Sequence, residues 1–199
     1  MFGDDMQTII EYLVNMSKYM IMVIPLYILI RFVMLSKSNK KINWYHEIIL
    51  FIFVLFITGL VSQTILPKFE FGVNGFRIVK DRIHETNLIP FKVLKETYVE
   101  VFINNNFNYF LINFLGNIIM FIPIGFLIPL LWNTSFKKVI IIGLCSSLFI
   151  ELVQLFLARG TDIDDVFLNT LGVFLGLLIY TLLYKKYQVF LNKFKYMKS

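Results

Sequence analysis

Five long apolar runs dominate this sequence and constrain its fold more than any other feature. They occupy roughly residues 18–35, 47–66, 109–132, 138–158 and 166–184. About 20 mostly apolar residues are enough for one helix to cross the hydrocarbon core of a bilayer, so each run is long enough. A membrane β-barrel would instead need short segments of alternating polarity. The sequence therefore predicts an all-α, polytopic membrane helix bundle with about five transmembrane helices.

The composition excludes several other classes of protein. Hydrophobic residues make up 58% of the chain and charged residues only 16%, more apolar surface than one soluble core can bury. The single cysteine, Cys145, rules out a disulfide framework, and the two histidines lie in separate segments, so we expect no metal and no cofactor. The net charge of +6 comes from lysines at the ends of apolar runs and in the tail. This pattern favours membrane topology over nucleic-acid binding.

The basic residues predict an orientation in the membrane. Cytoplasmic segments of membrane proteins are enriched in lysine and arginine. With the N-terminus outside, the inner segments 36–46, 133–138 and 185–199 carry 10 basic residues in 32, whereas the outer segments carry 8 in 67. We therefore expect a multi-pass membrane protein with a cytoplasmic C-terminus. No positively charged region precedes the first run, so it is expected to be a retained anchor.

We divide the chain into three parts. Residues 1–59 form an N-terminal transmembrane hairpin, residues 60–184 a membrane domain with the last three spans, and residues 185–199 a basic cytoplasmic tail. The outer segment 67–108 contains a predicted amphipathic helix, from Phe91 to Phe102, with charged side chains facing away from the aromatic ones. Such a helix can lie in the head-group plane or fold over the outer mouth of the bundle.

Polar residues recur at helical spacing in the last three spans and define the candidate site. Glu151 interrupts the fourth apolar run, where an ionisable group is expensive and tends to face the bundle interior. A short acidic loop follows, and Gly172 and Gly176 in the fifth run predict a close helix–helix contact. The candidate ligand-binding residues are Asn113, Asn117, Glu151, Gln154, Arg159, Asp162, Asp164, Asp165 and Asn169. Among these, Glu151, Arg159 and Asp164 are the candidate catalytic residues.

Structural roles compete with this interpretation. Asp162 or Thr161 can cap the helix that follows, and polar residues also hold membrane helices together by hydrogen bonds. In that case Glu151 pairs with Arg159. A proton or ion path is a third alternative.

Several segments together carry a family resemblance. They read NLIPF from Asn87, GNIIMFIPIGF from Gly116, and ELVQLFLARGTDIDDVFLNTLG from Glu151. In that order, within about residues 60–184, they resemble the VanZ-like family of small bacterial membrane proteins. The resemblance implies a link to resistance against teicoplanin, a glycopeptide antibiotic with a lipid tail. It supplies no catalytic residues.

Two functions follow as expectations. The first is a non-enzymatic protector that binds a lipid-anchored ligand at the outer leaflet. The second is a membrane-embedded enzyme that acts on a lipid-linked envelope precursor, with Glu151 as acid or base and Arg159 holding a phosphate or carboxylate. In that case the carboxylates of Asp162, Asp164 and Asp165 could bind a divalent cation. The expected partners are membrane lipid and either a glycopeptide or such a precursor. A transporter is disfavoured because the sequence shows no internal repeat.

Overall fold

The computed structural model describes residues 2–38, 41–72, 75–79, 86–157 and 160–195. The chain divides into two compact units, Met1–Asp81 and Arg82–Ser199. Five helices are long and apolar enough to span a membrane: Leu13–Ser36, Trp44–Thr64, Phe107–Leu131, Phe136–Phe156 and Ile163–Phe194. The predicted all-α bundle of about five transmembrane helices is therefore confirmed.

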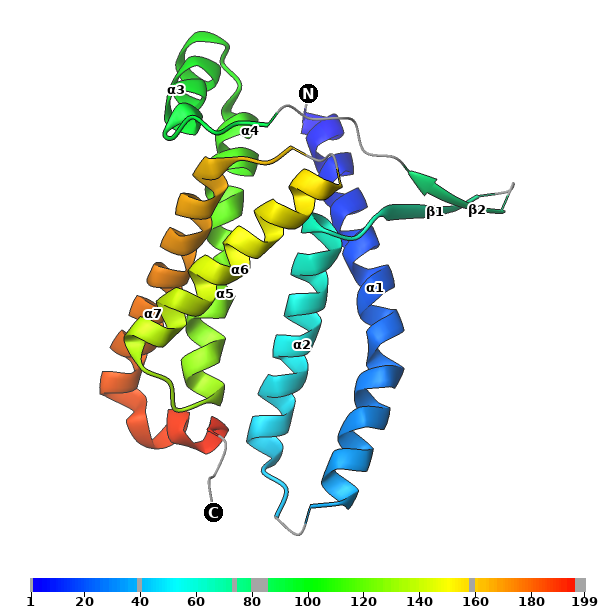
Figure 1. Cartoon of the computed structure of the whole chain (residues 1–199), viewed down its shortest axis with the longest axis vertical. Helices are drawn as coiled ribbons and strands as arrows, with labels where there is room; N and C mark the ends of the chain where they lie inside the picture. Colours follow the sequence, from blue (N-terminus) through cyan, green and yellow to red (C-terminus); the bar gives the residue numbers. More distant parts are fainter. Residues whose placement is uncertain (1, 39–40, 73–74, 80–85, 158–159, 196–199) are drawn as a thin grey trace. The chain divides into compact units, whose positions relative to one another are not determined.

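The first unit contains two long helices and a short hairpin (Figure 1). Helix α1 runs from Phe2 to Ser36 and helix α2 from Trp44 to Thr64. An ion pair joins them, since Arg31 Nε donates to Glu47 Oε2 at 2.8 Å and Arg31 Nη2 contacts Glu47 Oε1. Both groups lie within apolar spans, where charged side chains need a partner. The pairing therefore specifies how α1 packs on α2.

A two-stranded hairpin that is not expected from the sequence follows α2. Strand β1 (Lys68–Gly72) pairs antiparallel with β2 (Gly75–Val79), with Lys68 opposite Val79 and Gly72 opposite Gly75. The hairpin lies within the predicted outer segment 67–108.

The second unit is built on three spans. Short helix α3 (Lys92–Tyr98) continues into a π-helical turn, η1 (Val99–Ile103). After α4 (Phe107–Tyr109) and π-helical η2 (Phe110–Leu115) come α5 (Gly116–Leu131), α6 (Phe136–Phe156) and α7 (Ile163–Leu191). A 3-10 turn, η3 (Asn192–Phe194), ends the described chain. The first part of α7 continues through Lys185 and Lys186, which are compatible with a helix, and the helix is kinked at Tyr187, whose backbone is not helical (φ −122°, ψ 35°).

Glycines bring α5 and α7 into close contact. A Cβ atom built on Gly172 or Gly176 would collide with the carbonyl oxygens of Ile118 and Ile122 on α5, and one built on Gly125 would collide with that of Val173 on α7. Without side chains at these positions the two backbones can approach directly, as in other small-residue helix contacts. This confirms the close contact predicted from Gly172 and Gly176.

Candidate functional site

The site starts from the acidic loop before α7. Asp162 is the N-cap of α7, and its side chain accepts a hydrogen bond from the Asp164 amide at 2.9 Å. Short polar side chains at this position satisfy amide groups that the first helical turn leaves unpaired. Of the two caps that the sequence allows, Asp162 and Thr161, the structure has Asp162.

The NLIPF segment pairs with this loop through Asn87. The Asn87 amide donates to the Thr161 carbonyl at 2.8 Å, and the Ile163 amide donates to the Asn87 carbonyl at 3.0 Å. These bonds form a parallel β-bridge between Asn87 and Asp162. The Asn87 side chain adds a bond to Asp162 Oδ1 at 2.8 Å. Two motifs that lie far apart in the sequence are thus joined by backbone and side-chain hydrogen bonds.

Asp164 continues the connection to α3. Phe91, the N-cap of α3, has a left-handed backbone and no capping side chain. The Asp164 carboxylate takes that role, since it accepts from the Phe91 amide at 2.5 Å and the Val93 amide at 2.8 Å. With only 2% of its surface exposed, this carboxylate caps a helix that precedes it in the chain. Both of its oxygens therefore already accept backbone hydrogen bonds.

Glu151 on α6 contacts the acidic loop through hydrogen bonds. This side chain on α6 is 5% exposed, and its Oε2 accepts from the Asp162 amide at 2.9 Å. Its carbonyl accepts from the Thr161 hydroxyl at 3.4 Å. Burial raises the pKa of Asp162 above its usual range, because a carboxylate with less water around it is harder to ionise. The bond from the Asp162 amide to Glu151 and the bond from the Asp164 amide to Asp162 connect these three residues in one hydrogen-bonded series.

The other predicted residues lie in separate contacts. Asn117 on α5 donates to Asp165 at 2.5 Å, and Asn169 donates to the Ser147 hydroxyl at 2.8 Å. Asn169 is buried, and its Oδ1 has no hydrogen-bond partner within the described part of the chain. These contacts join α5 to α7 and α6 to α7.

Three candidate residues remain: Asn113, Gln154 and Arg159. The exposed side chain of Asn113 donates to the Tyr109 carbonyl, at 3.2 Å. Gln154 is half-buried near the end of α6. Arg159, and with it the expected Glu151–Arg159 pair, lies outside the described residues. Ligand binding by this set of residues stays a prediction.

Asn87 is the residue that the sequence analysis left out of the site. It is 8% exposed and forms hydrogen bonds through both backbone and side chain. Its place at the start of NLIPF was visible, but its partner lies 75 positions away. Among the described residues, no group of three histidine, cysteine, aspartate or glutamate side chains is arranged to hold a metal ion.

The motifs that meet at this loop lie within the part of the chain that is similar to known proteins. The family model described as VanZ/LLP1 matches residues 53–184. Protein VanZ from Enterococcus faecium is 42% identical over 129 residues, which cover 62% of this chain and 69% of that protein. No solved structure matches the chain.

Proposed function

The chain belongs to the VanZ/LLP1 family of membrane proteins, and from this premise we propose that it contributes to resistance against glycopeptide antibiotics of the teicoplanin type. It does so by binding a lipid-anchored ligand at the outer leaflet of the bacterial plasma membrane. The resistance role rests on the family, and the lipid-binding role rests on the surface of α3.

The observation that carries the proposal is an apolar surface on α3 and its flanks. We call it the α3 apolar face, and it consists of Leu88, Ile89, Phe91, Leu94, Tyr98 and Phe102. More than half of each side chain is exposed, from 51% for Leu94 to 71% for Phe102. An exposed apolar face with charged residues opposite is typical of helices that lie in the head-group region.

The acidic loop holds this face in a defined position. Asp164 caps α3, and Asn87 ties the preceding segment to the loop. Figure 1 shows α3 at the same end of the second unit as the α6–α7 connection. The fold therefore supports an apolar surface at one end of the bundle, where it can contact the tail of a lipid-anchored antibiotic.

Gene deletion tests the proposed role directly. Loss of the protein should lower the inhibitory concentration of teicoplanin more than that of vancomycin, because only teicoplanin has a lipid tail. An equal change for both drugs, or no change, would contradict the proposal.

Complementation tests the α3 apolar face. The double variant Leu94→Asn and Phe102→Asn should fail to restore resistance, because it removes apolar surface from this face. The matched control, Leu94→Met and Phe102→Leu, keeps the face apolar and should restore resistance. Both variants must melt in detergent at the wild-type temperature, so that a difference reports binding rather than folding.

A second candidate function is an enzyme that acts on a lipid-linked envelope precursor. It is favoured by one observation: the carboxylate of buried Glu151 accepts a single described hydrogen bond, at Oε2 from the Asp162 amide. A buried carboxylic acid of this kind suits proton transfer. Glu151→Gln keeps an acceptor for the Asp162 amide, so the fold should survive while turnover is lost. Unchanged amounts of lipid-linked precursors in Glu151→Gln cells, measured by mass spectrometry, would exclude this function.

A further inference from the structure

An open cleft of about 680 Å³ lies against the charged side of α3. The NLIPF segment forms one part of its lining, and Tyr109 forms another. The charged residues in the lining are Lys92, Lys95, Glu96 and Glu100. None of these belongs to the candidate site built around the acidic loop.

Internal contacts already engage both carboxylates of the cleft. Glu96 accepts from the Tyr109 hydroxyl at 2.6 Å and lies 3.2 Å from Lys92 Nζ. The bond from Tyr109 holds the pKa of Glu96 below its usual range, since hydrogen bonds to the charged form favour it. Glu100 accepts from the side-chain amides of Asn104 and Asn106, each at 3.0 Å. All four carboxylate oxygens therefore have donors from this protein.

Lys95 differs from its neighbours. It is exposed, and in the described part of the chain its ammonium group has no hydrogen bond or ion pair. An ammonium group carries three donors and no acceptor. Lys95 therefore offers three donors to a ligand in the cleft, and the natural partner of an ammonium group is an anion.

Part of the cleft lining is apolar. Ile89 and Phe91 line the cleft and also belong to the α3 apolar face, with 68% and 63% of their surfaces exposed. A ligand that fills the cleft therefore meets a cation and, next to it, surface suited to an acyl chain.

We propose that this cleft binds a lipid with an anionic head group, with Lys95 contacting the head group and Ile89 and Phe91 the upper part of the chain. The inference deepens the proposed function and rests on it for placing α3 at the membrane surface. It names a site and a ligand class that the acidic loop does not supply.

Native mass spectrometry of the purified full chain tests this site. The protein, in neutral detergent, is given equal amounts of phosphatidylglycerol and phosphatidylcholine with identical acyl chains. Wild type should retain phosphatidylglycerol over phosphatidylcholine by about tenfold, the ratio that about 1.4 kcal/mol of selective binding produces. Lys95→Gln should reduce the ratio to near one. Lys137→Gln, the same change at an exposed lysine of α6, should leave it unchanged.

Three outcomes would overturn the inference. The first is equal retention of both lipids by wild type, and the second is a preference for phosphatidylglycerol that survives in Lys95→Gln. The third is displacement of bound phosphatidylglycerol by an equal concentration of inorganic phosphate. The last result would mean a site for free anions rather than for a lipid.

The gene-deletion experiment and the lipid-binding experiment distinguish failure of the proposed function from failure of the lipid site. If gene deletion leaves teicoplanin tolerance unchanged while lipid selectivity depends on Lys95, the resistance role is wrong and the lipid site stands. If deletion lowers tolerance but wild type shows no lipid selectivity, the lipid site is wrong and the resistance role stands.

Discussion

At the scale of single residues, Asp164 has the most consequential contacts. Its carboxylate lies in α7, yet it caps α3 through the amides of Phe91 and Val93. A capping acceptor is normally supplied by the residue just before the helix. Here Phe91 occupies that position, and a residue 73 positions away supplies the acceptor. The start of α3 therefore depends on the acidic loop.

Replacing Asp164 should loosen α3 specifically. We expect Asp164→Ala to destabilise the protein by about 1–3 kcal/mol, the range for leaving buried donors unsatisfied. Hydrogen exchange at the Phe91 and Val93 amides should accelerate, because both lose their acceptor. The matched control is Asp164→Asn, which keeps one carbonyl oxygen and should protect one of the two amides. Unchanged exchange in Asp164→Ala would show that α3 holds its position without this cap.

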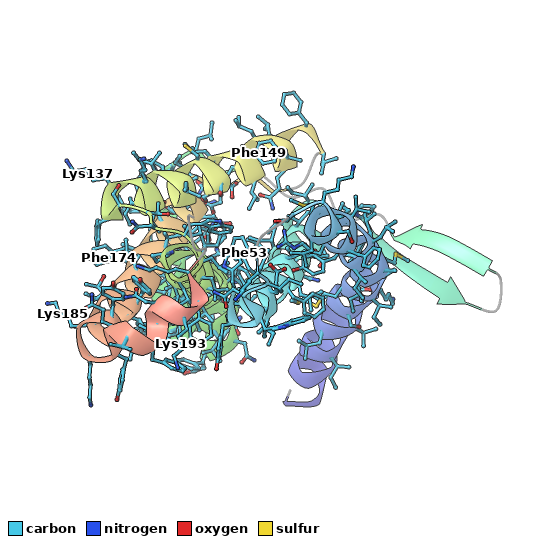
Figure 2. The ribbon with its side chains drawn as sticks, turned by 90° about the horizontal axis from the view of Figure 1, so that it is seen from below. Phe53, Lys137, Phe149, Phe174, Lys185 and Lys193 are labelled. Atoms are coloured by element: carbon cyan, nitrogen blue, oxygen red, sulfur yellow. The ribbon has the colours of Figure 1, made fainter. Side chains whose placement is uncertain are left out.

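At the scale of elements, the contact between α5 and α7 organises the second unit. Gly172 and Gly176 on α7 face carbonyl oxygens of α5, and Gly125 on α5 faces one of α7. Phe174 of α7, labelled in Figure 2, meets Phe136 of α6 edge to face. On α7, glycines therefore face α5, whereas the large side chain of Phe174 contacts α6.

A side chain at Gly172 should push α5 and α7 apart. A Cβ atom there meets backbone, which cannot rotate away, so we expect Gly172→Ala to cost about 1–3 kcal/mol from overpacking and Gly172→Leu to cost more. Gly116→Ala is the control, because its Cβ would sit 3.4 Å from the Leu111 carbonyl, an ordinary contact. Thermal melting in detergent should fall for both Gly172 variants only. A melting temperature of Gly172→Leu equal to wild type would contradict the contact.

At the scale of the whole molecule, basic residues gather at one end of the second unit. Lys137 projects outward from the start of α6, and Lys185 from the end of α7 (Figure 2). Figure 1 places these two helix ends together, opposite the α6–α7 connection. This agrees with the charge pattern from which we predict that this end faces the cytoplasm.

Cysteine labelling tests the orientation. In a Cys145→Ser background, Thr86→Cys should react with a membrane-impermeant maleimide added to intact cells, whereas Ser199→Cys should react only after the cells are opened. Labelling of Ser199→Cys from outside would reverse the proposed topology.

Much of this protein follows from its sequence alone. The five helices and the close approach at Gly172 and Gly176 are predicted, and a cap at Asp162 or Thr161 is allowed, because run length, side-chain size and capping chemistry act locally. The predicted end of the fifth span near residue 184 lies close to the kink at Tyr187, whereas the short helical segment after the kink is not predicted.

Only the tertiary structure decided which distant segments meet. The Asn87–Asp162 bridge, the capping of α3 by Asp164 and the Arg31–Glu47 ion pair each join residues that no local pattern relates. Asp164 shows the reason most clearly. From sequence it was an acidic residue in a loop, equally suited to a ligand or to the helix dipole. Its actual partners are amides that reach it because the chain folds α3 back over the start of α7.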